Sequence, residues 1–145
     1  PVGDYPCFHC GPVMKQENGI WKVVSAGPTT SARMEIFEDI FMDAFGTKIF
    51  VGKGGMGERT SAALKKTGAV YTQFTGGAGS LMAGAVESVE DVFYLDELGI
   101  PEAIWLLNVV KFGPCLVTMD SEGRSIHRTL AGQVVKNLEK IKETL

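Results

Sequence analysis

Long apolar runs are absent from this 145-residue sequence, since no stretch approaches the roughly 18 residues that a membrane-spanning helix needs. An excess of positive charge is absent too, because 14 Lys and Arg face 17 Asp and Glu and give a formal net charge of −3. That balance argues against nucleic-acid binding through bulk charge. The three cysteines are too few for a disulfide framework, and no signal-peptide pattern opens the sequence. We therefore expect a cytoplasmic protein that binds neither a membrane nor nucleic acid.

Apolar residues and glycine are well represented. Hydrophobic residues make up 45% of the sequence, which is enough for one buried core, and the length is that of one domain. We therefore expect a single domain over 1–145. Many of the 18 glycines cluster in 52–57 and 76–84, where we expect tight turns or close backbone approach.

Strand-like and helix-like patterns alternate along most of the sequence, which predicts an α/β fold with a mostly parallel or mixed sheet. The expected strands are short apolar runs at 21–26, 48–52, 69–74, 102–110 and 114–120, the last two buried, while 89–95 is either a strand or irregular. The expected helices lie at 31–45, 58–66, 79–86 and 129–145, the last with an apolar stripe at Leu130, Val134, Leu138 and Ile141.

The segment Ser25–Glu35, with the sequence SAGPTTSARME, joins an expected strand to an expected helix. One of Thr29, Thr30 and Ser31 can cap the helix with its side-chain oxygen, but three successive hydroxyls exceed what one cap needs. Arg33 in the first turn opposes the helix macrodipole, at a cost of a few tenths to about 1 kcal/mol. Backbone N–H groups, hydroxyls and a guanidinium together favour carboxylate binding.

A lysine follows the next expected strand, within the glycine-rich sequence VGKGGMG. The GxGxxG spacing of dinucleotide-binding loops is matched by Gly52, Gly54 and Gly57, but the acidic residue that would hold the ribose about 20 positions further on is missing. A phosphate-binding P-loop is also not matched, because no Ser or Thr follows Lys53. We interpret Lys53 instead as a cation at the carboxyl end of a strand, with a solvated lysine as the alternative. If the two strands are neighbours, Arg33 and Lys53 converge on one crevice suited to a small dianion.

Cys7 and Cys10 form a CxxC pair around His9. The alternative is a redox pair or half of a zinc site. The only other Cys and His residues, Cys115 and His127, are isolated in the sequence. We therefore interpret Cys7 and Cys10 as small core residues. Neither histidine has an obvious carboxylate or nucleophile partner, so neither is given a catalytic role. No metal or cofactor site is predicted in this chain, and the carboxylates of EIFEDIFMD are predicted to face solvent.

Five segments carry a family resemblance: SAGPTTSARM, VGKGGM, GGAGSLMA, ELGIPEAIW and LVTMDSEG, in this order between about Cys10 and about Ser125. They resemble the C-terminal or β-subunit domain of the iron–sulfur fumarate hydratases and the related L-tartrate dehydratases. The resemblance implies a swivelling β/β/α domain, an α/β fold with a mixed sheet flanked by helices. It also implies a hetero-oligomer in which a partner α subunit, and not this chain, carries a [4Fe–4S] cluster.

The same resemblance implies an activity and residue roles. The family adds water reversibly to a small dicarboxylate, so we expect a hydro-lyase β subunit that converts fumarate to malate only with its α subunit. Thr30 matches the residue proposed as base, and together with Arg33 it is the expected catalytic pair. Thr29, Thr30, Arg33 and Lys53 are expected to bind substrate. The alternatives are L-tartrate dehydration and a non-catalytic carboxylate-binding or scaffold module.

Two departures from the family pattern are visible. Family members usually carry an earlier segment with an Arg-Asp-x-x-His-like element that also reaches the site, and this sequence contains none. We therefore expect the domain over 1–145 to be N-terminally incomplete. Lys111 in VVKFGP stands where the family often has an acidic residue.

Overall fold

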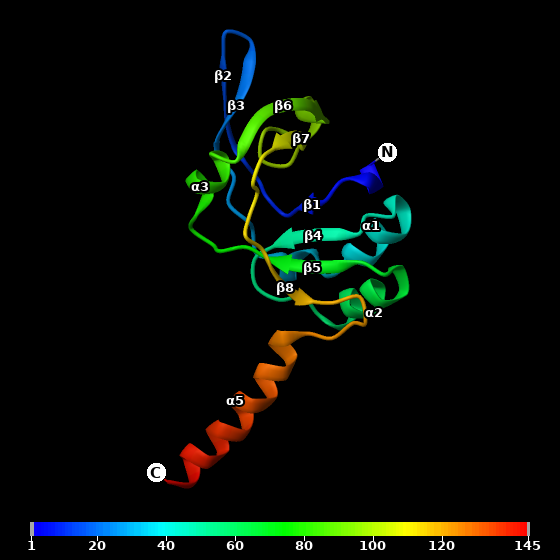
Figure 1. Cartoon of the computed structure of the whole chain (residues 1–145), viewed down its shortest axis with the longest axis vertical. Helices are drawn as coiled ribbons and strands as arrows, with labels where there is room; N and C mark the ends of the chain where they lie inside the picture. The colour runs from blue at the N-terminus through cyan, green and yellow to red at the C-terminus, as the bar shows by residue number, and fades with distance from the viewer. Residues whose placement is uncertain (1, 145) are drawn as a thin grey trace.

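Within residues 2–144, which the computed structural model describes, four strands form the central sheet in the order β1-β4-β5-β8 (Figure 1). Their bounds are β1 (Cys7–Phe8), β4 (Ile49–Gly52), β5 (Val70–Gln73) and β8 (Leu116–Met119). β4 runs parallel to β1 and to β5, whereas β8 runs antiparallel to β5. The mixed sheet with flanking helices confirms the predicted α/β class. The swivelling β/β/α assignment stays a prediction.

Two antiparallel hairpins lie outside that sheet, at the end of the molecule opposite helix α5 (Figure 1). Their strands are β2 (Val13–Glu17) with β3 (Ile20–Ser25), and β6 (Val86–Phe93) with β7 (Ile104–Val109). Asn18 and Gly19 connect β2 to β3, and both have positive φ, as a tight two-residue hairpin turn requires. Trp21 and Trp105 stack edge to face with ring centroids 5.2 Å apart, so they join the two hairpins.

Helices α1 and α2 cover one face of the central sheet, and α3 lies beside β3 (Figure 1). The helical bounds are α1 (Glu38–Phe45), α2 (Glu58–Thr67), α3 (Gly79–Ala83), α4 (Leu95–Leu98) and α5 (Ile126–Glu143), with 3-10 turns η1 (Val2–Asp4) and η2 (Ser31–Met34). Phe50 and Leu64 are fully buried in the core under α1 and α2. Val51 and Met82 belong to a second buried cluster. Burial of each such large apolar side chain contributes about 1.5–3 kcal/mol.

Helix α5 extends away from the central sheet and has no buried residue (Figure 1). Its start is anchored, because Ser125 Oγ accepts the Arg128 N–H at 3.4 Å and the Arg128 guanidinium donates to the carbonyl of Gly123 at 3.1 Å. The predicted amphipathic helix is confirmed, and its apolar stripe lies exposed at Leu130, Val134, Leu138 and Ile141. Among residues 2–144, none of the helices combines the length and the apolar character needed to cross a bilayer.

Several predicted elements differ in extent. The helix expected over 31–45 is divided into η2 and α1, because the Glu35 side chain between them turns toward α2 and binds its first turn. The helix expected over 79–86 ends at Ala83, since Val86 already begins β6. β2 was not predicted. The strands expected to be buried at 102–110 and 114–120 form as β7 and β8, but β7 has no fully buried residue and half of β8 is exposed.

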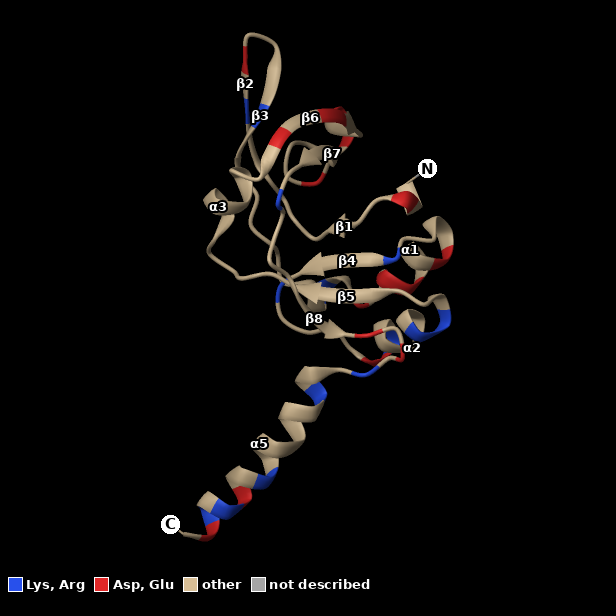
Figure 2. Ribbon diagram, in the orientation of Figure 1, with Lys and Arg blue, Asp and Glu red and all other residues tan. Residues whose placement is uncertain are grey.

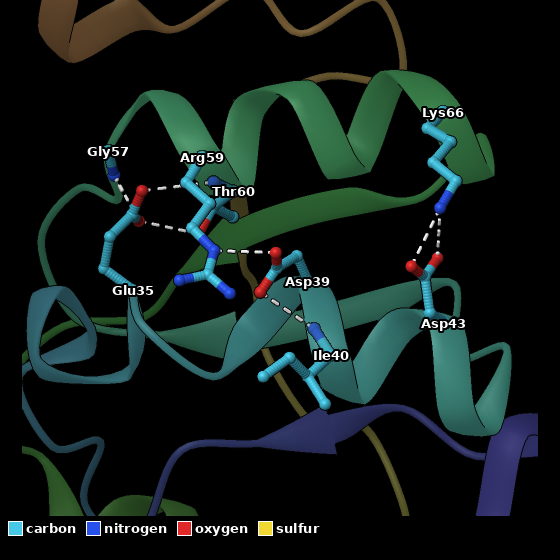
Figure 3. Close-up of polar contacts among 8 residues, drawn as sticks. All are labelled: Glu35, Asp39, Ile40, Asp43, Gly57, Arg59, Thr60 and Lys66. Carbon is cyan, nitrogen blue, oxygen red and sulfur yellow. Dashed lines mark hydrogen bonds and ion pairs between the residues drawn. The ribbon is translucent and has the colours of Figure 1, made fainter.

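Opposite charges join α1 to α2. Figure 2 shows acidic residues along α1 and basic residues on α2. Asp39 accepts a hydrogen bond from Arg59 Nε at 2.6 Å, and Asp43 pairs with Lys66 Nζ at 2.8 Å (Figure 3). Both pairs are exposed, so each contributes little to stability, and they join α1 to α2 beside the sheet.

Candidate active site

The segment Thr29–Ser31 lies beside Lys53 at the carboxyl end of β4. The ladder between β1 and β4 ends with a hydrogen bond from His9 N–H to the Val51 carbonyl at 2.8 Å. Thr30 then continues that side of β4 by forming a parallel bridge with Lys53, and Ser31 N–H donates to the Lys53 carbonyl at 3.1 Å. The backbone of Thr30 and Ser31 therefore meets that of Lys53 although β3 belongs to a separate hairpin and is not a neighbour of β4. The convergence of the Arg33 and Lys53 charges stays a prediction.

Arg33 and Thr29 contact each other directly. Arg33 Nη2 donates to Thr29 Oγ1 at 2.5 Å, and the Thr29 N–H donates to the His9 carbonyl at 2.7 Å. Thr30 occupies the N-cap position of η2 but makes no side-chain capping hydrogen bond, so of the three hydroxyls considered as a cap, that of Thr30 is not used as one. Thr30 and Arg33 are both exposed, so both side chains are accessible to a ligand.

The Lys53 side chain is half-buried and lies against a second glycine loop. A Cβ atom at position 76 would lie only 2.8 Å from Lys53 Cδ, so Gly76 leaves room for the lysine stem. Gly54 follows with φ of +76°, a conformation that favours glycine. The alternative of a fully solvated lysine is therefore not supported, because packing directs the Lys53 stem.

Glu35 binds the first turn of α2. Its carboxylate accepts hydrogen bonds from the backbone N–H groups of Gly57 and Thr60 at 2.6 and 3.1 Å, and from the Thr60 hydroxyl at 2.7 Å (Figure 3). Burial raises the pKa of the Glu35 carboxyl, but these hydrogen bonds outweigh burial and hold its pKa below the ordinary 4.5. The predicted solvent-facing role is wrong for this carboxylate, since it supplies the anion that the helix N-terminus favours.

Glu38, His9 and Ser31 form a buried polar chain that sequence reasoning missed. His9 Nδ1 lies 2.9 Å from Ser31 Oγ, and His9 Nε2 lies 3.1 Å from Glu38 Oε1. The second contact is a close charge contact outside hydrogen-bond geometry, so Oε1 has no aligned hydrogen-bond partner among the described residues. The expectations that His9 lacks a carboxylate partner and that Glu38 faces solvent are both wrong. Glu38 and Ser31 are only 4% and 0% exposed.

His127 lies at the start of α5 and packs on the glycine loop that follows Lys53. Its Nε2 atom is 3.1 Å from Gln73 Oε1 at the end of β5. A Cβ atom on Gly55 would lie 2.9 Å from His127 Cδ2, so the imidazole is in close contact with that backbone. Its observed partner is an amide, which agrees with the expectation that His127 has no carboxylate partner.

The three cysteines are partly buried and pack against the core, which agrees with the interpretation of Cys7 and Cys10 as small apolar residues. Cys7 packs against the cluster under α1 and α2, whereas Cys10 and Cys115 pack against the second cluster. Burial, with a smaller effect of the Glu38 charge, raises the pKa of Cys7 to about 12, and burial raises that of Cys10 to about 11. Among residues 2–144, no three His, Cys, Asp or Glu side chains are grouped closely enough to hold a metal ion.

Three relatives place these residues in a known family. A "Putative fumarate hydratase class I" of Geobacillus stearothermophilus is 48% identical over 94% of this chain, which spans 26% of that relative. A "Putative L(+)-tartrate dehydratase subunit beta" of Methanocaldococcus jannaschii is 43% identical over 92% of this chain, which spans 69% of it. An "L(+)-tartrate dehydratase subunit beta" of Escherichia coli K12 is 43% identical over 82% of this chain, which spans 59% of it.

The family pattern described as Fumarase C-terminus matches residues 1–130. The match includes Thr29, Thr30, Arg33 and Lys53, and it ends within the first turns of α5. With this match and the sequence identities above, the resemblance stated from the sequence is confirmed: the chain belongs to the Fumarase C-terminus family.

Proposed function

We propose that this chain supplies substrate-carboxylate binding and a proton acceptor to a hydro-lyase that interconverts fumarate and malate. The observation that carries the proposal is the arrangement at the end of β4, where Arg33 contacts Thr29 and Lys53 pairs with Thr30. Relatives named fumarate hydratase and L(+)-tartrate dehydratase support the reaction class. Because the chain spans 26% and 59% of these two relatives, the activity of the whole protein is part of the proposal.

The chemistry assigns each group a task. Arg33 and Lys53 pair with the two carboxylates of the substrate and hold its reacting carbon beside the threonine hydroxyls. In the direction from malate to fumarate, a threonine alkoxide takes the proton from the carbon next to one carboxylate, while the hydroxyl group leaves the other carbon with the C–O bonding electrons. The proton held by the threonine then passes to this hydroxide, which gives water and restores the alkoxide. A threonine hydroxyl is a poor base, and its alkoxide is populated only when a cation stabilises it; Arg33 provides that cation. In the reverse direction the threonine hydroxyl returns the proton to carbon.

Two threonines are candidates for this base. The family resemblance assigns the role to Thr30, and that assignment stays a prediction. Thr29 is favoured by one observation, since its Oγ1 already accepts a hydrogen bond from Arg33 at 2.5 Å. Thr30 pairs with Lys53 through the backbone, which supports a role for it beside the lysine.

The [4Fe–4S] cluster that the family implies does not fit the cysteines of this chain. Cys7 belongs to one core cluster while Cys10 and Cys115 belong to the other, and burial disfavours the thiolates that would bind iron. We therefore place the cluster on a partner α subunit, in a hetero-oligomer. The designation "subunit beta" of two relatives supports a partner. The three free cysteines support a reducing compartment such as the cytoplasm.

L(+)-Tartrate is the second candidate substrate. Two of the relatives are named L(+)-tartrate dehydratase subunit beta, and tartrate presents the same pair of carboxylates to Arg33 and Lys53. A non-catalytic carboxylate-binding module is the alternative from another class. The test is anaerobic reconstitution of the complex with an α subunit carrying the cluster, followed by assays with fumarate, malate and tartrate. Binding of these dianions without turnover of any of them would leave only the binding module.

Removal of either cation tests the residue assignment. We expect Arg33→Ala and Lys53→Ala each to lower kcat/KM about 100-fold or more, because each removes a group that pairs with developing or substrate charge. Lys66→Ala is the matched control, since Lys66 is an exposed cation on α2 paired with Asp43. Circular dichroism checks that each variant is folded. Native activity in both Arg33 and Lys53 variants would rule out the assignment.

A further inference from the structure

A carboxylate, an imidazole and a hydroxyl lie in series beneath the proposed site. Glu38 on α1 contacts His9 Nε2 at 3.1 Å, and His9 Nδ1 lies 2.9 Å from Ser31 Oγ in η2. The series ends at the site itself, because Ser31 Oγ accepts the backbone N–H of Lys53 at 3.0 Å. The side chains of Glu38 and His9 are each only 5% exposed, and Ser31 is 0% exposed, so the series is shielded from bulk solvent.

Room for this series is built into the sheet. A Cβ atom at position 52 would collide with Ser31 Oγ, and it would lie 2.7 Å from the Tyr71 hydroxyl and 3.1 Å from His9 Nδ1. Gly52 therefore lies where any larger residue would displace the polar groups. The Tyr71 hydroxyl donates to the carbonyl of Gly54 at 3.1 Å, so a second buried side chain fixes the backbone just after Lys53.

The hydrogen-bond directions follow from the His9 tautomer. In the tautomer with its proton on Nε2, His9 accepts the Ser31 hydroxyl proton at Nδ1, which lies 2.9 Å from Oγ. Ser31 Oγ then has lone pairs available for the Lys53 N–H. Buried charges and polar groups destabilise a fold unless they are paired. Three apolar side chains in these positions would fill the same space without the free-energy cost of burying polar groups. Packing alone therefore does not explain a polar series that ends on Lys53 and adjoins Thr30.

We propose that Glu38, His9 and Ser31 are positioning residues, which act through the Lys53 backbone to hold its ammonium group and the neighbouring threonine pair in place for the dicarboxylate. This inference rests on the proposed function, since the geometry it maintains is that of the proposed substrate site. None of the three contacts substrate in this account. A displacement of about 1 Å at such a site can lower the rate about 100-fold, so the effect on catalysis is measurable.

Activity of the reconstituted complex gives the first readout. We expect Ser31→Ala and Glu38→Ala to lower kcat/KM roughly 10- to 100-fold, mostly through a higher KM, because Lys53 binds substrate. Glu38→Gln keeps an acceptor oxygen facing Nε2 and is expected to stay within about 5-fold of the native value. Met42→Ala is the control, since Met42 is 1% exposed in the adjacent core but makes no contact with Lys53. Its activity per folded molecule is expected to be unchanged.

Hydrogen exchange of the Lys53 amide gives a second readout that needs no substrate. In the chain itself, NMR should show faster exchange of this amide in Ser31→Ala and Glu38→Ala than in Met42→Ala at equal global stability. If the Ser31 and Glu38 variants match Met42→Ala in both readouts, or if Glu38→Gln behaves like Glu38→Ala, the positioning role is wrong. The two proposals can also fail separately. If the native complex is inactive but the Lys53 amide exchanges faster in the Ser31→Ala and Glu38→Ala variants, the proposed function is refuted and the positioning role is supported.

Discussion

Arg33 lies in the last turn of η2, a 3-10 turn of only four residues. The macrodipole cost expected for a cation in the first turn of a helix over 31–45 therefore does not apply, because α1 begins only at Glu38. The guanidinium is exposed and contacts Thr29, a contact that the sequence could not show. An exposed guanidinium next to a hydroxyl is suited to bind a carboxylate, which supports the proposed binding role.

The two threonines can be separated by substitution. We expect Thr29→Val to lower kcat about 100-fold or more with a smaller change in KM, because valine keeps the shape but removes the hydroxyl that lies on Arg33. Thr30→Val should mainly raise KM if Thr30 only binds substrate. The measurement is steady-state kinetics of the reconstituted complex.

Thr29→Ser is the control for this prediction, since serine retains a hydroxyl at the same place. The reverse pattern, with kcat lost only in Thr30→Val, would restore the assignment of the base to Thr30. If both valine variants have the same kcat as the native protein, neither threonine is the base.

At the scale of elements, Glu35 decides where the first helix begins. Its carboxylate binds the N-terminus of α2, 22 to 25 positions further along the chain, and a Cβ atom on Gly57 would lie 2.5 Å from Glu35 Oε1. The apolar periodicity of 31–45 predicts one helix because it reports only local spacing. The long-range contact of Glu35 prevails, because a charged carboxylate that accepts three hydrogen bonds stabilises more than one further helical turn.

The Glu35 contact predicts a stability loss that depends on pH. The folded pKa of this carboxyl is below its ordinary 4.5, so its stabilisation is complete above about pH 4.5 and disappears as pH falls through the folded pKa. Glu35→Gln should therefore lower the free energy of unfolding by about 1–2 kcal/mol at pH 7 and by less at pH 3. Urea unfolding at both pH values measures this, and an equal difference at pH 7 and pH 3 would contradict the charge-based account.

Helix α5 is an element whose apolar face stabilises nothing in the described chain. Val134 and Leu138 are 64% and 48% exposed, so Val134→Ala and Leu138→Ala should change the free energy of unfolding by no more than about 0.5 kcal/mol. Leu64→Ala is the comparison, since Leu64 is 0% exposed and its truncation should cost about 2–5 kcal/mol. Thermal unfolding measures both, and a large loss in the α5 variants would show that the stripe packs against something.

At the scale of the whole molecule, the sheet carries a buried cluster on each side, and the cysteines belong to these clusters. With the pKa of Cys7 raised from 9.0 to about 12, its thiolate fraction at pH 8 is lower by roughly a thousandfold. Thiol reagents should therefore modify Cys7 only as the protein unfolds globally. The labelling rate across a urea titration, followed by mass spectrometry, checks this, and fast labelling of Cys7 in the native protein would contradict its burial.

The α/β class, most strands and helices, and the segments that carry Thr29, Thr30, Arg33 and Lys53 can be predicted from the sequence. These features follow from local spacing of apolar residues, glycines and hydroxyls, which a sequence displays directly. Which distant residues meet is known only from the folded structure. Thr30 pairs with Lys53 although β3 lies outside the central sheet, and Glu38 is buried against His9. Such contacts depend on strand order and on how chain segments 20 or more positions apart pack, and periodicity contains no information about either.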